Sequence, residues 1–313
     1  MEKKHTTKRW GDKPYVSLDY TLKQQYGHKV YRVALNGGMT CPNRDGSLND
    51  RGCICCSAGG SGDFAGDKNT SITDQLNTGI KALSEKRPCE GYIAYFQAYT
   101  NTYASVDYLR KVFTEAISHP QVHILAIGTR PDCLPKEVLD LLDELNRIKP
   151  VWVELGLQTM HEKTAEYIRR GYPLSCFEDA LSNLRKRNLT VIVHVILGLP
   201  GESKEMMCQT VSYLAHHDIQ GIKLQLLHVL EGTDLAADYR SHPFDVFSQD
   251  DYCDFICHLL TLLPPTIAIH RLTGDGPSKD VLVPKWSLNK RSVLNQIHRT
   301  LKDKNMWQGM NYK

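Results

Sequence analysis

The stretch Thr190-Val-Ile-Val-His-Val-Ile-Leu197 is a nearly continuous run of β-branched and aliphatic residues. Similar runs recur along the chain at residues 29–35, 91–97, 122–128, 151–157, 221–229 and 267–270. Such runs are typical of parallel strands that are covered on both faces. The spacing of apolar residues between the runs predicts helices at residues 72–87, 106–118, 135–147, 162–170, 176–187 and 204–216. Ser71, Ser105 and Ser203 are the predicted N-caps, and Asp74 completes a capping box with Ser71.

This alternation of strands and helices predicts an α/β fold with a parallel sheet and right-handed crossovers. Six or seven units are too many for a small flavodoxin-like sheet and fewer than an eightfold barrel needs. We therefore predict a partial (β/α)6-type TIM-like barrel at residues 29–284. Residues 1–28 are a predicted N-terminal extension, and residues 285–313 form a C-terminal basic helix or tail. Functional groups are expected at the carboxyl ends of the barrel strands.

The composition is that of a soluble globular protein, because 41% of the 313 residues are hydrophobic and 23% are charged. No run approaches 18 apolar residues, so we expect no membrane span. The polar start of the chain does not read as a secretory signal. Ten cysteines without such a signal favour reduced thiols and a cytoplasmic location.

The charge is unevenly distributed along the chain. Residues 285–313 hold seven basic residues and one acid, and residues 1–13 hold five basic residues and two acids. The net charge is only +3, so the middle of the chain is net acidic. Basic ends on an acidic body favour a polyanionic partner, and a solvated terminal helix explains them equally well.

Three cysteines follow the first strand run, in the loop Cys41-Pro-Asn-Arg-Asp-Gly-Ser-Leu-Asn-Asp-Arg-Gly-Cys53-Ile-Cys55-Cys56. Thiolates bind soft metals, and three of them leave one iron of a [4Fe–4S] cluster open. The alternative is a structural zinc site, with Cys55 or Cys89 as the fourth ligand. Zinc sites typically use two compact ligand pairs, and Cys41 has no close partner. The spacing therefore favours the cluster.

Polar side chains fall on or after the predicted strands. A charged residue on a buried strand must be paired or face a cavity, as expected for Glu154. Arg130 has the donors to clamp a carboxylate or phosphate. Each residue alone also has a simpler explanation as a turn or a hydrogen-bonded core group. Together they predict one site, formed by Gln97, Tyr99, Arg130, Glu154, Gln158, His194, Gln225 and His228.

These motifs resemble radical S-adenosylmethionine (SAM) enzymes. The resemblance rests on the three-cysteine loop, the segment Gly198-Leu-Pro-Gly201-Glu202 and the strand containing Glu154 and Gln158. It extends over roughly residues 15–310. The resemblance is most specific to the YtqA/YhcC-type subgroup, which is related to the catalytic subunit of Elongator. The segments that resemble this subgroup are Cys41-Pro-Asn-Arg-Asp-Gly46, Tyr95-Phe-Gln-Ala-Tyr-Thr-Asn-Thr-Tyr103, Gly128-Thr-Arg-Pro-Asp-Cys-Leu134 and Glu154-Leu-Gly-Leu-Gln-Thr159.

The resemblance implies two cofactors, a [4Fe–4S] cluster and SAM, and a 5′-deoxyadenosyl radical as their product. Cys41, Cys53 and Cys56 would bind three irons, and the fourth iron would take the amino and carboxylate groups of SAM. It implies SAM contacts for residues on or directly after four strands, and it assigns no residue a catalytic role. Those contacts are Gln97 and Tyr99 near the methionine part, Arg130 and Glu154 near the carboxylate and ribose, and His194, Leu197 and Gly198 near the adenine. Gln158 is a further expected SAM contact, with no part of the cofactor assigned to it.

The resemblance also implies a substrate, the wobble uridine of tRNA, with conversion of a carboxymethylaminomethyl group to aminomethyl. The expected partners are tRNA and an external electron donor of flavodoxin or ferredoxin type. The C-terminal helix would dock through an apolar face and direct a basic face toward phosphates, with Lys290, Arg291, Arg299 and Lys302 outward. A small-molecule or peptide substrate is one alternative, and a zinc-stabilised RNA-binding protein without catalysis is the other.

Two departures from the general family pattern concern the cysteine loop. Eleven residues separate Cys41 from Cys53, where the family usually has three, and the subgroup shares this longer spacing. Cys55 stands before the last cysteine, where an aromatic residue is usual. We therefore expect a three-ligand site with a spare thiol.

Overall fold

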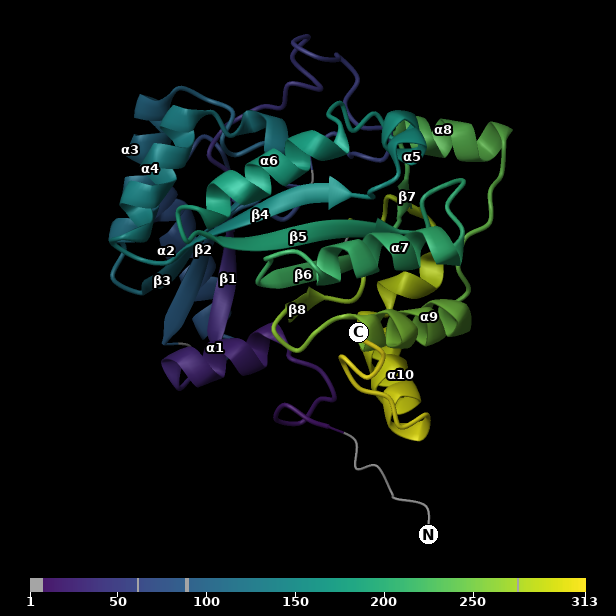
Figure 1. The fold of residues 1–313 in the computed structure, drawn as a ribbon. Helices are drawn as coiled ribbons and strands as arrows, with labels where there is room; N and C mark the ends of the chain where they lie inside the picture. Colours follow the sequence, from purple (N-terminus) through teal and green to yellow (C-terminus); the bar gives the residue numbers. More distant parts are fainter. Residues whose placement is uncertain (1–7, 61, 88–89, 275) are drawn as a thin grey trace.

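A seven-stranded parallel sheet, curled into a half-barrel, forms the centre of the protein (Figure 1). The computed structural model describes residues 8–60, 62–87, 90–274 and 276–313. The strands follow one another in the sheet in chain order, and every neighbouring pair is parallel. This confirms the predicted partial barrel, with strands β1 (Val30–Leu35), β2 (Gly91–Phe96), β3 (Val122–Thr129), β4 (Val151–Gln158), β5 (Thr190–Leu197), β6 (Gly221–Leu226) and β8 (Ala268–Arg271).

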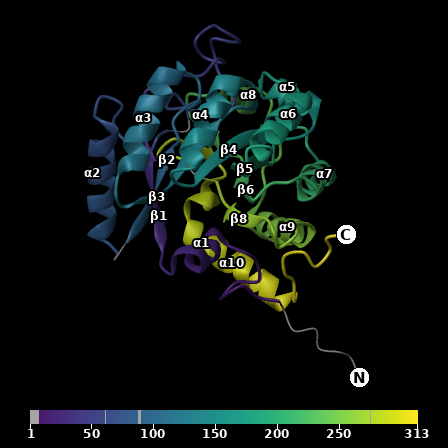
Figure 2. The same ribbon diagram turned by 60° about the vertical axis from the view of Figure 1, so that its left-hand side comes forward.

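The helices that connect the strands cover the convex face of the sheet (Figures 1 and 2). The serine caps are confirmed, because Ser71, Ser105 and Ser203 each accept a hydrogen bond from a backbone N–H three residues later. Ser71 Oγ also donates to the carboxylate of Asp74 at 2.7 Å. The predicted helices are α2 (Ile72–Ser84), α3 (Val106–Ser118), α4 (Lys136–Asn146), α5 (Glu162–Tyr167), α6 (Leu174–Arg185) and α7 (Lys204–Ala215).

Strand β4 illustrates how the sheet separates core from site. Side chains alternate between the two faces of a strand, so neighbours point in opposite directions. Val153 and Leu155 belong to the main core between sheet and helices. Glu154 and Gln158 line the cavity on the concave face. A hydrophobic run that looks uniform in sequence therefore carries its functional groups on one face only.

Helix α1 (Leu18–Tyr26) closes the barrel at the amino-terminal ends of the strands (Figure 1). Ser17 caps it, and Leu22 inserts into a second core cluster inside the barrel with Ile93 and Ile192. The sequence did not predict this helix, because its four hydrophobic residues are interrupted by polar ones.

Substitution Leu22→Ala should destabilise the protein. Leu22 is only 2% exposed, so its removal leaves a cavity among rigid strand residues. The expected loss of unfolding free energy is about 2–5 kcal/mol, measured by denaturant titration. Leu288→Ala is the matched control, because Leu288 is 40% exposed and should change stability little. Equal effects of the two substitutions would contradict a plug role for α1.

The first and last strands of the sheet, β1 and β8, contact each other through a pair of side chains. Arg32 Nη2 on β1 lies 3.0 Å from Nδ1 of His270 on β8. Ser17 also forms a parallel bridge with Ile269 at the same place. We call these contacts the seam. They join segments that are more than 230 residues apart in the chain.

The C-terminal region packs beside β8, where α10 (Lys290–Asp303) lies against α9 (Gln249–Leu262) (Figure 2). The apolar face of α10 is buried, as predicted, and Lys290, Arg291, Arg299 and Lys302 are exposed. The thiols of Cys253 and Cys257 donate to α10 carbonyls at 3.7 and 3.5 Å, so both are packing residues. The other short elements are η1 (Pro131–Cys133), α8 (Asp234–Ser241) and η2 (Lys285–Leu288).

Two predicted elements are shorter than expected. The strand predicted at 221–229 ends at Leu226, and its continuation β7 (Val229–Leu230) pairs antiparallel with β9 (Val281–Val283). The helix predicted at 162–170 ends at Tyr167, because the following chain adopts positive φ angles at Arg169 and Gly171. Within the described parts of the chain, no helix has the length and apolar character needed to cross a bilayer.

Candidate active site in the half-barrel

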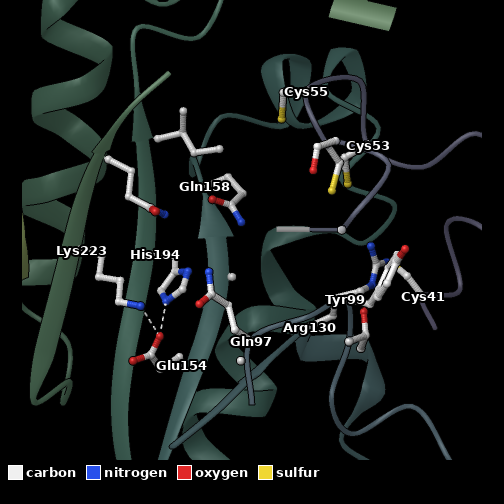
Figure 3. A pocket seen from close by; sticks show the side chains of 18 of the residues that line it. Cys41, Cys53, Cys55, Gln97, Tyr99, Arg130, Glu154, Gln158, His194 and Lys223 are labelled. Atoms are coloured by element: carbon white, nitrogen blue, oxygen red, sulfur yellow. Dashed lines mark hydrogen bonds and ion pairs between the residues drawn. The ribbon is translucent and has the colours of Figure 1, made fainter. Parts of the chain in front are cut away.

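A cavity of about 280 Å³ opens at the carboxyl ends of the strands, between the cysteine loop and the concave face of the sheet (Figure 3). Residues from six strands of the seven-stranded sheet, from β7 and from the loop contribute to its wall. Most of the residues expected at the carboxyl ends of the strands therefore lie around this one cavity. Those that line the cavity are Cys41, Cys53, Cys56, Gln97, Tyr99, Arg130, Glu154, Gln158, His194, Gln225 and His228.

Leu197 and Gly198, expected beside the adenine, are not among the residues that line this cavity. Leu197 is fully buried in the core between sheet and helices. The backbone N–H of Gly198 points toward Sδ of Met207, at 3.1 Å. Ile196 lines the cavity instead, because the side chain that precedes Leu197 points to the opposite face of β5.

The cysteine loop is held by Asn43. Its Nδ2 donates to the carbonyl of Arg169 at 2.7 Å and to Sγ of Cys53 at 3.4 Å. Its own carbonyl accepts from the backbone N–H of Gly52 at 2.6 Å. Burial raises the pKa of the Cys53 thiol to about 11, and nearby Cys56 adds to the shift while the Asn43 bond opposes it. Asn43 therefore orients Cys53 and stabilises its thiolate form.

The donor set fits a [4Fe–4S] cluster better than a zinc ion. In residues 8–60, 62–87, 90–274 and 276–313, no three His, Cys, Asp or Glu side chains converge on one point where a metal ion could bind. A cluster does not need that convergence, because each cysteine binds a different iron. Cys41, Cys53 and Cys56 line one cavity and can do so.

Cys55 also lines the cavity, but it has different surroundings. It packs against an apolar cluster that includes Ile54, Ile168 and Leu199. Burial raises the pKa of its thiol far above the usual value. Figure 3 shows its sulfur apart from that of Cys53. The spare thiol is therefore a packing group at the edge of the site.

Tyr99 ties the exit of β2 to the far end of the cysteine loop. Its backbone N–H donates to the carbonyl of Gly60 at 2.8 Å, and its hydroxyl donates to the carbonyl of Ala58 at 2.7 Å. A Cβ on Gly60 would lie 2.2 Å from the tyrosine ring, so only glycine fits there. Tyr99 itself has a φ of 58°, a strained conformation of the kind found at functional sites.

Gln158 presents an unsatisfied polar atom to the cavity. Its Oε1 is buried and has no hydrogen-bond partner among the described residues. Its φ is 68°, and Figure 3 shows its amide directed into the open space between β4 and the cysteines. A buried acceptor without a partner is costly, and a ligand donor would satisfy it.

Arg130 is less available than its sequence context suggests. Its Nε and Nη2 donate to both carboxylate oxygens of Asp132 at 2.9 and 2.7 Å. Its guanidinium also lies over the Tyr172 ring, 4.9 Å from the centroid. Asp132 thus occupies one edge of the group, and Arg130 can offer only its three remaining N–H donors to a ligand.

Glu154 lies at the floor of the cavity and is fully engaged by the protein. One carboxylate oxygen forms an ion pair with Arg32 Nη2 at 2.9 Å, and the other accepts hydrogen bonds from His194 Nε2 at 2.9 Å and from Lys223. Burial alone would raise the pKa of Glu154, but Arg32, Lys223 and His194 outweigh it and hold the pKa well below its usual value. Burial lowers the pKa of His194 to about 4, so its neutral ring donates to the carboxylate.

Arg32 and Lys223 were missed by the sequence analysis, although the signal was present. Each is a cation inside an apolar strand, in Val-Tyr-Arg32-Val and Gly-Ile-Lys223-Leu. The same argument that selected Glu154 applies to both. Tyr95 completes the floor, with Lys223 Nζ 3.2 Å from its hydroxyl.

Comparison with known proteins gives a consistent result. The Radical SAM superfamily matches residues 47–214, and the Radical_SAM C-terminal domain matches residues 219–303. The uncharacterized protein YtqA of Bacillus subtilis is 45% identical over 95% of this chain and 92% of its own length. The protein YhcC of Escherichia coli is 35% identical over 90% of each chain.

More distant relatives match only part of the chain or only its fold. The tRNA uridine(34) acetyltransferase of Methanocaldococcus jannaschii is 26% identical over 49% of this chain and 28% of its own. The solved structure of Elp3 from the archaeon Methanocaldococcus infernus superimposes with a TM-score of 0.70 at 18% identity. It covers 89% of this chain and 64% of that one. The family match spans most of the barrel and a 45% identical relative aligns along nearly the whole length, so this chain belongs to the radical SAM superfamily, whose members use a [4Fe–4S] cluster and SAM.

Proposed function

We propose that this radical SAM enzyme modifies the wobble uridine of tRNA, converting a carboxymethylaminomethyl group to aminomethyl. The observation that carries the enzymatic part is that three cysteine thiols and the strand-end polar groups line one cavity. Similarity to a tRNA uridine(34) acetyltransferase supports the substrate. The exposed basic face of α10, formed by Lys290, Arg291, Arg299 and Lys302, supports a polyanionic partner.

The residues have separate tasks in this proposal. Cys41, Cys53 and Cys56 hold the cluster, which with SAM and one electron from a flavodoxin- or ferredoxin-type donor supplies the 5′-deoxyadenosyl radical. Gln97, Tyr99 and Gln158 orient SAM between the cysteines and the floor. The enclosing strands exclude water from the reacting groups.

The test is the modified-nucleoside profile of tRNA from a deletion strain that carries either the wild-type gene or Cys41→Ala. We expect aminomethyl-type wobble nucleosides with wild type, and accumulation of the carboxymethylaminomethyl nucleoside with Cys41→Ala. Cys176→Ala is the matched control, because this half-exposed thiol lies on α6 and does not line the cavity. Identical wobble profiles in the wild-type and Cys41→Ala strains would rule out the tRNA substrate and favour a small molecule or peptide.

A further inference from the structure

Lys223 carries a hydrogen-bond donor that faces the cavity. Among the described residues, its Nζ contacts a carboxylate oxygen of Glu154 and the hydroxyl of Tyr95. An ammonium group has three donors, so one remains for a ligand. The side chain is 2% exposed and still lines the cavity. A ligand in the cavity is therefore the partner that this donor can reach.

A second cation stands beside Lys223. Arg271 on β8 is its register partner across the β6–β8 pair, and both residues line the cavity. Gln225, two residues further along β6, accepts from Arg271 Nη1 at 3.4 Å. Two like charges at paired positions of neighbouring strands repel each other, and an anion between them relieves that repulsion.

Two cations of the floor share one carboxylate, that of Glu154. Arg32 and Lys223 contact the carboxylate of Glu154, and His194 is its third partner. Burial lowers the pKa of Lys223 to about 7, against the opposing effect of Glu154, and Arg32 and Arg271 lower it further. Burial also lowers the pKa of both His194 and His270, so neither histidine supplies a charge at neutral pH. An incoming anion would find a positive environment.

We propose that Lys223 and Arg271 form an anion-binding floor that selects the substrate by a carboxylate at the end of its reacting substituent. This rests on the proposed function, in which the substituent ends in a carboxymethyl group. The carboxylate of SAM is expected at the cluster, and Figure 3 shows Lys223 on the opposite side of the cavity from Cys53. The phosphates of an RNA stay on its backbone, outside the barrel, while the base and its substituent enter.

The test compares two anticodon stem-loops on the reconstituted enzyme with SAM bound. One carries carboxymethylaminomethyluridine, and the other carries aminomethyluridine, which lacks the carboxylate. We expect wild type to bind the first about 10-fold more tightly, because a hydrogen bond to a charged group contributes about that factor. Lys223→Met should lose this preference, Lys223→Arg should keep part of it, and the Kd for SAM should stay unchanged in both.

The controls separate this proposal from the proposed function. Lys204→Met removes an exposed lysine outside the cavity and should keep the preference. If Lys223→Met unfolds, Arg271→Gln tests the same floor. N-methylglycine is a probe that contains the carboxylate without any RNA. If its binding depends on Lys223 while neither stem-loop binds, the anion-binding floor is supported and the tRNA substrate is rejected. The floor would be overturned if Lys223→Met weakened the binding of both stem-loops equally, or if it raised only the Kd for SAM. It would also be overturned if wild type did not discriminate between the stem-loops or did not bind N-methylglycine.

Discussion

Cys53→Ala will abolish SAM cleavage, whereas Cys55→Ala will leave it nearly intact. Cys53 belongs to the set of three thiols that fits a cluster, and Asn43 positions its sulfur. Loss of a supporting residue around a metal site already costs about 10–100-fold, so loss of a ligand should cost more than 100-fold. Cys55 packs against apolar side chains, and its replacement by alanine removes only that contact.

The measurement is iron and sulfide content after anaerobic reconstitution, together with 5′-deoxyadenosine formed with a chemical reductant. Wild type and Cys55→Ala should each hold about four irons per chain. Cys53→Ala should hold fewer and cleave no SAM. The reverse order, with Cys55→Ala losing the iron, would mean that Cys55 replaces one of the three proposed ligands.

Glu154→Gln is expected to destabilise the protein by about 3–5 kcal/mol, the range measured for breaking a buried ion pair from one side. The substitution keeps the shape but removes the charge that faces Arg32 and Lys223. Arg32 cannot release its proton, so its charge stays buried without compensation. Glu144→Gln is the matched control, because the Arg110–Glu144 pair is about half exposed and should be worth less than about 1 kcal/mol.

The pH dependence of the same pair of proteins checks the cause. The folded state holds the pKa of Glu154 well below its usual 4.5, so its ionised form stabilises the protein above that pH. As pH falls from 5 toward 3, this contribution decreases in wild type and has no counterpart in Glu154→Gln. The stability gap between the two, measured by denaturant unfolding, should narrow. A gap that stays constant would mean that Glu154 acts through packing and not through charge.

The sequence predicted the barrel well, because parallel strands buried on both faces leave a strong local pattern. The capping serines were also local signals, and the structure confirms them. Helix α1 was missed because what decides its position is contact with the barrel interior, through Leu22. The strand predicted at 221–229 is longer than β6, because Val229 is as apolar as a barrel residue although it pairs with β9.

Residue type and strand position predicted which residues line the cavity. They did not predict which side chains these residues contact. Arg130 looked free to bind a ligand, and only the structure shows that Asp132 occupies one edge of it. Glu154 looked like a SAM contact, and the structure surrounds it with Arg32, His194 and Lys223. These partners come from three different strands, so no spacing within one segment could reveal them.

The seam has a consequence for how the protein is made. Arg32 is among the first barrel residues to leave the ribosome, and its partner His270 follows more than 230 residues later. At roughly 5–20 residues per second, at least about ten seconds of synthesis separate them. During that interval the nascent barrel stays open, because Arg32 lacks its partner on β8. We therefore expect cofactor loading to follow the synthesis of β8, which completes the seam.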